Sequence, residues 1–192
     1  MIHFKKIRWK NFLSTGNAFT EVQLDRTKST LIIGDNGAGK STILDALTFV
    51  LFGKPFRAVN KSQLINSVNQ NGTEVEVEFS IGSKQYLVKR GIKKNFFEIY
   101  QDGKMLNQDA SVRDYQEYLE KTILKLNYKS FTQIVILGSS SFVPFMQLKA
   151  NDRRTIIEDL LDIEIFSVMN QLLKVRVAQN KEDMGTVDIA LG

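Results

Sequence analysis

The chain has 192 residues, a net charge of +5 and 43% hydrophobic residues, which suits one sizeable domain with a packed core. It has no cysteine and one histidine, so a disulfide framework, a cysteine-based zinc site and a histidine metal cluster are excluded. The N-terminal segment has no secretory core and no apolar run long enough to span a membrane, so a cytoplasmic protein is expected.

Short apolar or alternating runs predict strands over residues 2–9, 19–24 and 29–33, and the third of these has the composition of a buried strand. A helix is expected over residues 40–52. Its apolar residues lie nearly all round the helix axis, which is typical of a buried helix. The glycine and proline that follow this segment end the helix.

The hydrophobic period then changes to two, and residues 73–107 are predicted to form an antiparallel β-meander with Gly-containing turns. The rest of the chain is expected to be mainly helical, because its apolar residues recur every three or four positions. The predicted elements are a helix over 111–126, a buried strand over 132–137, a helix over 151–161 that Asn151 caps, and a helix from 163 to about 180.

The segment between the third strand and the first helix matches G-x-x-x-x-G-K-[ST] in the strand–loop–helix context that this motif requires. Glycines allow consecutive backbone N–H groups to curl around a phosphate, and the helix N-terminus adds further donors. The Lys40 ammonium suits the β- and γ-phosphates, and the Ser41 hydroxyl suits Mg²⁺. The sequence therefore predicts a site for ATP and Mg²⁺ formed by Gly34, Asn36, Gly37, Ala38, Gly39, Lys40, Ser41 and Thr42.

Three segments are similar to a known family: "KIRWKNFLSTG", "GDNGAGKSTILDALTFVLFGKPFR" and "KSFTQIVILGSSSFVPFMQLKANDRRTIIEDLLDIEIF". In combination they resemble the SMC-like DNA double-strand-break repair ATPases, which include bacterial SbcC. Within that family, "LFGKPFR", "QLINS" and "FVPFM" look closest to the ATPase subunits of T-even phage recombination endonucleases. The resemblance covers about residues 1–180.

The resemblance implies an α/β fold, the P-loop ATPase head of ABC type, of which this chain is the N-terminal lobe. The lobe would span residues 1–150 and include the meander as a subdomain. Residues 151–192 would form helices that begin a coiled coil, with residues 182–192 as a disordered or extraneous tail. The sequence contains no Walker B or signature motif, so we expect ATP binding without appreciable hydrolysis by this chain alone.

The resemblance also implies partners. In this family two ATPase heads dimerise around ATP, bind an SbcD-like metallo-phosphoesterase nuclease and engage double-stranded DNA ends. ATP-driven dimerisation of the heads would control the access of DNA and nuclease. A phage-encoded member would act in the host cytoplasm.

The resemblance also implies further site residues, and for some of them two interpretations stay open. Relatives use a glutamine to reach Mg²⁺ and the attacking water; Ser139 aligns with it, whereas Gln133 is the only nearby amide with that chemistry. Together with Lys40 these are the candidate catalytic residues, and Gln133 joins Ser41 as a candidate metal ligand. Asn66 and Ser67 lie where relatives approach adenine, although a plain helix end explains them equally well. Leu13 replaces an arginine that many relatives place near the nucleotide.

Two basic clusters fit either phosphate-backbone contacts with DNA or a solvated surface. They are Lys5, Lys6, Arg8 and Lys10, and Lys84, Lys89, Arg90, Lys93 and Lys94. Four aromatic residues at strand spacing favour packing over base stacking; these are Tyr86, Phe96, Phe97 and Tyr100. An apolar stripe of Ile165, Met169 and Leu172 fits the start of a coiled coil or a docking face for the nuclease.

Two rival functions follow from the same residues. A RecF-like ATPase, or one similar to the overcoming-lysogenization-defect proteins, shares the basic first strand and the Asn-Phe turn. A truncated, non-catalytic lobe that only binds DNA or a partner is the other alternative.

Overall fold

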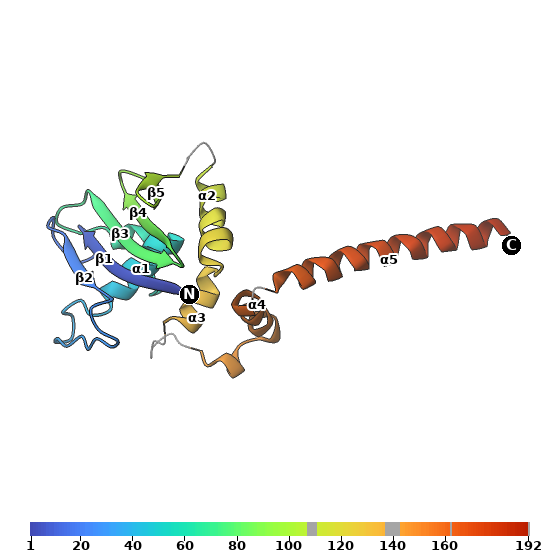
Figure 1. The fold of residues 1–192 in the computed structure, drawn as a ribbon, viewed down its shortest axis with the longest axis horizontal. Coiled ribbons are helices and arrows are strands. Elements are labelled where there is room, and N and C mark those ends of the chain that lie inside the picture. The colour runs from blue at the N-terminus through green and yellow to red at the C-terminus, as the bar shows by residue number, and fades with distance from the viewer. Residues whose placement is uncertain (107–110, 137–142, 162, 192) are drawn as a thin grey trace. The chain divides into compact units, whose positions relative to one another are not determined.

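The computed structural model describes residues 1–106, 111–136, 143–161 and 163–191. The chain divides into two compact units, Met1–Phe142 and Val143–Gly192. The first unit carries the sheet and the glycine-rich loop, and the second consists of helices (Figure 1). Among the described residues, no helix combines the length and the apolar content needed to cross a lipid bilayer.

The first unit is built on one six-stranded antiparallel sheet with the strand order β2-β1-β3-β4-β5-β6 (Figure 1). Its strands are β1 (Ile2–Lys10), β2 (Thr20–Gln23), β3 (Thr73–Ile81), β4 (Lys84–Ile92), β5 (Phe96–Gln101) and β6 (Lys104–Met105). The predicted first two strands and the predicted meander are confirmed. The meander is not separate from the N-terminal strands, because β3 pairs along β1, with Trp9 opposite Val75.

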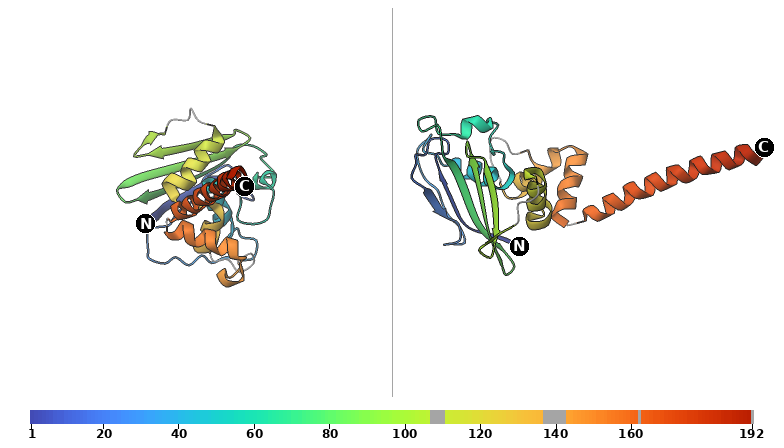
Figure 2. Two further views of the ribbon diagram at one scale, coloured as in Figure 1. Left: turned by 90° about the vertical axis from the view of Figure 1, so that its right-hand side faces the viewer. Right: turned by 90° about the horizontal axis from the view of Figure 1, so that it is seen from above.

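One face of the sheet is apolar and carries the core. Val75, Val77 and Phe79 alternate along β3 with no exposed surface. The helix α1 (Thr42–Phe52) packs on this face, where the ring of Phe49 lies 5.7 Å from that of Phe12. Figure 2 shows α1 and α2 (Val112–Tyr118) on the same side of the sheet. Burying one large apolar side chain contributes about 1.5–3 kcal/mol to the stability of the folded state. The core on this face is therefore the main source of stability for the unit.

The remaining helical elements of this unit are short. They are η1 (Lys61–Leu64), the π-helical turn η2 (Leu119–Leu124) that continues α2, and α3 (Tyr128–Ile134). The helix predicted over 111–126 is therefore formed by α2 and η2. The predicted aromatic packing is also found, since Tyr86 stacks on Phe79 and Phe97 packs edge-on against Tyr115.

The other face of the sheet is charged, and its charges are balanced across strands. The basic residues of β1 lie opposite the glutamates of β3, and a lysine of β4 approaches from the other side. The ion pairs are Lys6–Glu78 at 2.9 Å, Arg8–Glu76 at 2.6 Å, Lys10–Glu74 at 2.8 Å and Lys89–Glu76 at 3.2 Å. Three residues of the first predicted basic cluster, but only Lys89 of the second, therefore pair with carboxylates in the described part of the chain.

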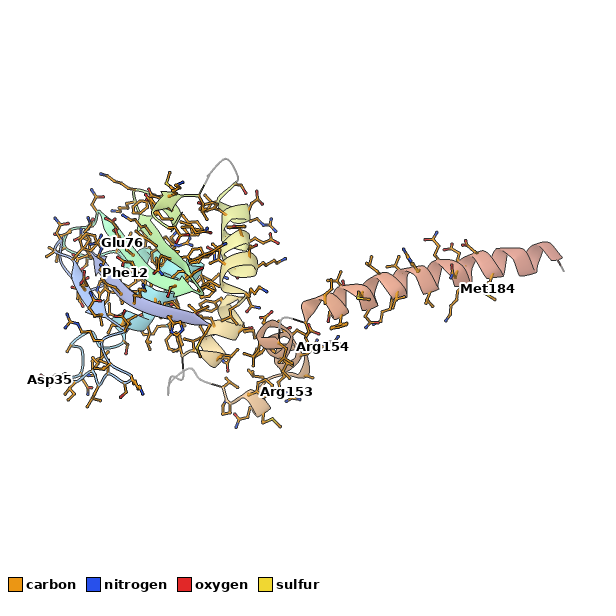
Figure 3. All side chains as sticks on the ribbon, in the orientation of Figure 1. Phe12, Asp35, Glu76, Arg153, Arg154 and Met184 are labelled. Atoms are coloured by element: carbon orange, nitrogen blue, oxygen red, sulfur yellow. The ribbon has the colours of Figure 1, made fainter. Side chains whose placement is uncertain are left out.

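Glu76, labelled in Figure 3, pairs with two basic residues of this charged face. Its side chain is only 3% exposed and accepts from both Arg8 and Lys89. Burial by itself raises the pKa of Glu76, but the hydrogen bond from Arg8 and the charge of Lys89 outweigh burial and hold that pKa below 4.5.

Arg90 lies on the opposite, apolar face, which corrects its assignment to a surface cluster. Its guanidinium donates to the carbonyl oxygen of Val50 at 3.1 Å and to Gln116 at 2.5 Å, and it lies 3.7 Å from the Phe97 ring centre. Burial lowers the pKa of Arg90 to about 9, so it is charged at neutral pH. A cation at the C-terminal end of α1 stabilises the helix dipole.

The segment 29–33 is not the buried strand that the sequence predicted. Leu31, Ile32 and Ile33 are 82%, 47% and 84% exposed and lie outside the strands of the described chain. A strand needs a neighbour for its N–H and C=O groups, and the six-stranded sheet offers none here. The apolar composition of this segment therefore does not make it a strand of the described sheet.

The strand predicted over 132–137 is also wrong, because residues Tyr128–Ile134 form α3. The Asn127 side chain accepts from the backbone N–H of Ser130 at 2.9 Å, which is a helix N-cap. A short apolar run cannot distinguish a buried strand from a buried helix, and the cap decides for the helix.

The second unit contains η3 (Phe145–Gln147), α4 (Ala150–Leu161) and α5 (Glu164–Leu191). A polar latch, defined here as Arg154, Glu158 and Ser167, joins the two long helices. Arg154 donates to Glu158 at 2.6 Å and to Ser167 at 3.1 Å, and Ser167 donates to Glu158 at 2.5 Å. The predicted disordered tail instead lies within α5, where Figure 3 labels Met184.

We predict that Glu76→Gln destabilises the chain by about 1–3 kcal/mol at neutral pH, because Arg8 and Lys89 lose a charged acceptor. The pKa of Glu76 is lowered by folding, so its stabilisation is present above 4.5 and is lost as the pH falls through the folded-state pKa. Denaturant unfolding of the variant and the parent chain at several pH values measures both effects.

Glu78→Gln is the matched control, since Glu78 lies on the same strand but is 38% exposed. Its effect should stay within about 1 kcal/mol. Equal losses in the two variants would contradict the special role of Glu76.

Candidate nucleotide site

The glycine-rich loop between residues 34 and 41 lies at the surface, where Figure 3 labels Asp35. Gly37 and Gly39 both have a φ of 89°, a left-handed conformation in which a side chain would be strained. The Lys40 ammonium donates to the carbonyl oxygens of Gly34 at 2.5 Å and Asp35 at 2.7 Å. The lysine thus lies across the loop and directs its charge to the loop's interior side.

Several donors of this loop have no partner within the described chain. They are the backbone N–H groups of Gly37, Gly39, Lys40 and Ser41. The Ser41 side chain likewise makes no capping bond at the start of α1. Free amides around a lysine at a helix N-terminus are the donor set that binds a phosphate chain.

A cavity of about 510 Å³ opens beside the loop. Its walls come from three places in the chain: the loop and the start of α1, the turn after β1, and the segment after α1. The lining residues are Leu13, Ser14, Asn36, Gly37, Gly39, Lys40, Ser41, Thr42, Arg57, Gln63, Ile65 and Ser67. A volume in this range suits a small-molecule ligand.

Most of the predicted nucleotide residues line this cavity, but three do not: Gly34, Ala38 and Asn66. Gly34 packs against Ala38, because a Cβ built on Gly34 would lie 3.3 Å from the Ala38 Cβ. These two residues therefore shape the loop from behind. Ser67 lines the cavity, whereas its neighbour Asn66 points elsewhere.

Asn66 is buried, and its side chain links two loops through hydrogen bonds. Its side-chain amide donates to the carbonyl oxygens of Leu13 and Thr15, both at 3.0 Å, and its oxygen accepts from the backbone N–H of Asn69 at 2.9 Å. Asn69 in turn donates to Asn11 at 2.6 Å. This asparagine network holds together the two loops that supply Leu13, Ser14, Ile65 and Ser67 to the cavity wall.

Arg57 is a lining residue that the sequence analysis missed. Its guanidinium and its backbone N–H all bind the carboxylate of Asp45, at 2.5 to 3.0 Å. Asp45 has no exposed surface, and it lies one turn after Ser41 within an apolar helix. A buried carboxylate in such a helix needs a cationic partner, and that requirement was the available signal.

Of the two candidates for the glutamine of the relatives, only Gln133 is among the described residues. Gln133 lies in α3 and is not among the cavity-lining residues; its side-chain oxygen is buried and has no hydrogen-bond partner in the described chain. Ser139 lies outside the described residues. Among the described residues, Gln133 therefore does not line the cavity.

The donor set also fits the metal that normally accompanies a nucleotide. No group of three or more His, Cys, Asp or Glu side chains in the described part of the chain could hold a metal ion by itself. Mg²⁺ commonly takes one or two protein oxygens, and phosphates and waters complete its shell. The unbonded Ser41 hydroxyl, beside the phosphate cradle, suits that arrangement.

Comparisons with known proteins agree with this site. A family model described as an AAA domain, AAA_23, matches residues 6–184. The chain is 45% identical over 174 residues to exonuclease subunit 2 of Escherichia phage RB69, an alignment that covers 91% of this chain and 31% of that protein. It is 31% identical over 175 residues to the DNA double-strand break repair Rad50 ATPase of Thermoplasma acidophilum, covering 88% and 19%. The chain thus spans about a third or less of these curated relatives.

Among solved structures, the Smc head domain with an extended coiled coil from Pyrococcus furiosus superposes with a TM-score of 0.67 at 22% identity, covering 98% of this chain and 49% of that one. This likeness confirms the predicted fold class, the α/β P-loop head. The predicted resemblance to SMC-like repair ATPases is confirmed by the named relatives. Because the family model covers nearly the whole chain, the chain belongs to the AAA_23 family of AAA domains.

Proposed function

We propose that this chain binds ATP with Mg²⁺ and acts as the phosphate-binding lobe of an SMC-like ATPase in DNA repair or recombination. The observation that carries the proposal is the set of free backbone amides, with Lys40 and Ser41, at one wall of the cavity. Relatives named as an exonuclease subunit and as a double-strand break repair ATPase support the DNA context.

In this proposal the chain's own residues bind and orient the nucleotide. Lys40 exchanges its two carbonyl acceptors for phosphate oxygens, which are stronger acceptors because they are charged. The free amides of Gly37, Gly39, Lys40 and Ser41 would hold the phosphate chain. The Ser41 hydroxyl would help to hold Mg²⁺, which supplies charge neutralisation for phosphoryl transfer. Gln133 and Ser139 stay as proposed contacts to the metal and the attacking water.

Hydrolysis would require residues beyond this chain. The exposed apolar segment Leu31–Ile33, directly before the loop, supports a second lobe whose strands would cover it. We infer that this lobe, and a second head across the nucleotide, complete the catalytic site. ATP binding would then join two heads and control the access of DNA ends to an SbcD-like metallo-nuclease.

DNA contact is assigned to the turn between β4 and β5. Lys93 and Lys94 are exposed there, and neither has an ion pair in the described chain. In contrast, Glu74, Glu76 and Glu78 pair with four basic residues of the sheet, which are Lys6, Arg8, Lys10 and Lys89. A turn with two lysines that form no ion pair among the described residues suits the phosphate backbone, which is bound without regard to sequence.

Lys40→Ala is expected to weaken the binding of ATP and Mg²⁺ by about 10- to 100-fold, since a charge-assisted hydrogen bond contributes roughly 1.5–3 kcal/mol. Titration calorimetry with ATP in the presence and absence of magnesium measures the change. Lys54→Ala is the control, because Lys54 is exposed just beyond α1 and does not line the cavity. The proposal fails if the parent chain shows no magnesium-dependent affinity for adenine nucleotides.

The purified 192-residue chain is expected to bind ATP with negligible turnover, because it lacks the residues that complete the catalytic site. Phosphate release over hours at saturating ATP measures the turnover. Robust hydrolysis that Lys40→Ala abolishes would show that this lobe is catalytically sufficient, and would overturn the need for a second lobe.

Charge reversal at Lys93 and Lys94 together is expected to weaken DNA binding and to flatten its dependence on salt, because fewer counterions are released. The measurement is the slope of log affinity against log salt for a short duplex. The double reversal of Lys6 and Lys10 is the control; their charges are offset by Glu78 and Glu74. An unchanged slope in the Lys93 and Lys94 variant would remove the assignment.

A further inference from the structure

The dipeptide Asn-Gly occurs twice in the chain, at Asn36–Gly37 and at Asn71–Gly72. Asparagine is a thermolabile residue. A following glycine has no Cβ, so its backbone nitrogen is open to approach from the asparagine side chain. The two sites also share two further properties: both asparagines are exposed, and both glycines have a positive φ, 89° at Gly37 and 62° at Gly72.

The two sites differ in a contact between the asparagine side chain and the glycine nitrogen. The backbone N–H of Gly72 donates to the side-chain oxygen of Asn71 at 2.8 Å. This bond places the Gly72 nitrogen next to the Asn71 side-chain carbonyl and polarises that carbonyl. The Asn36 side chain makes no hydrogen bond among the described residues, so nothing holds it against the Gly37 nitrogen.

We propose that Asn71 is a site of spontaneous deamidation, ahead of Asn36. Solvent base removes the N–H proton of Gly72, and its nitrogen attacks Cγ of Asn71, forming an N–Cγ bond while the side-chain oxygen takes a proton from water. The Cγ–Nδ2 bond then breaks, the amide leaves as ammonia with the hydroxyl proton, and a succinimide ring remains. Solvent water adds to either ring carbonyl and opens the ring, giving aspartate or isoaspartate. No oxidant or reductant takes part.

The modification would act on the asparagine network of the cavity wall. The Gly72 carbonyl accepts from the Asn11 side chain at 3.4 Å, and the next residue, Thr73, donates to the Asn11 carbonyl at 2.8 Å. Isoaspartate adds one methylene to the main chain at this junction and brings a negative charge. The inference rests on covalent chemistry and one contact, so it stands whether or not the chain binds ATP.

The test ages the full 192-residue chain, without nucleotide, in mildly alkaline buffer and maps its tryptic peptides by mass spectrometry. Asn36 falls in peptide 29–40 and Asn71 in peptide 62–84, and fragmentation separates Asn71 from Asn66 and Asn69. In the folded chain the deamidated fraction at Asn71 should be several times that at Asn36, and should rise with pH because the attacking nitrogen loses its proton more readily.

The experiment has two controls. Asn71→Gln lengthens the side chain at an exposed position, and it should remove the signal from peptide 62–84 while leaving peptide 29–40 unchanged. In denaturant the native contact is lost, so the two Asn-Gly sites should react at similar rates. Equal rates in the folded chain, or a reaction at Asn71 in denaturant only, would overturn the proposal.

Discussion

The nucleotide cavity depends on the burial of α1 against the apolar face of the sheet. Nine of the eleven residues of this helix are buried, so it cannot rotate without exposing core side chains. Its C-terminal end is held by Arg90 from β4, and by Gln116 from α2, which donates to the Leu51 carbonyl at 2.9 Å. With one end fixed inside the unit, the other end presents its free amides at the surface.

The same helix fixes the far wall of the cavity through Asp45. Its buried carboxylate binds Arg57 from the segment beyond the helix, so the helix and that segment form one rigid frame. The asparagine network does the same for the other wall. Asn11 and Leu13 have positive φ values of 49° and 53°, conformations that cost of order 1–3 kcal/mol each. The hydrogen bonds of Asn66 and Asn69 offset that cost.

The sequence predicted the parts of the fold that local pattern determines. The alternation of apolar and polar residues over 73–81 specifies a strand. The glycine-lysine motif before an apolar helix specifies a phosphate-binding loop. It could not specify partners distant in the chain. Arg90 looked like part of a surface cluster because only its position on β4 shows that it points inward. Asn66 looked like a base contact because its acceptors, Leu13 and Thr15, lie more than fifty positions away.

The two wrong strands have a common origin. The runs over 29–33 and 132–137 are short and apolar, and their secondary structure is decided by neighbours rather than by their own residues. For the second run the neighbour is the Asn127 cap, which selects a helix. For the first run, no strand among the described residues supplies backbone partners, and the segment stays outside the sheet.

The latch between α4 and α5 has a mechanical consequence. The helix α5 has 28 residues, which corresponds to a length of about 42 Å at 1.5 Å per residue. Because the helix is long, a tilt of about 5° at its first turn displaces its far end by roughly 4 Å. The hydrogen bonds of the polar latch lie at the first turn of α5, so they help to set the direction of the helix relative to α4.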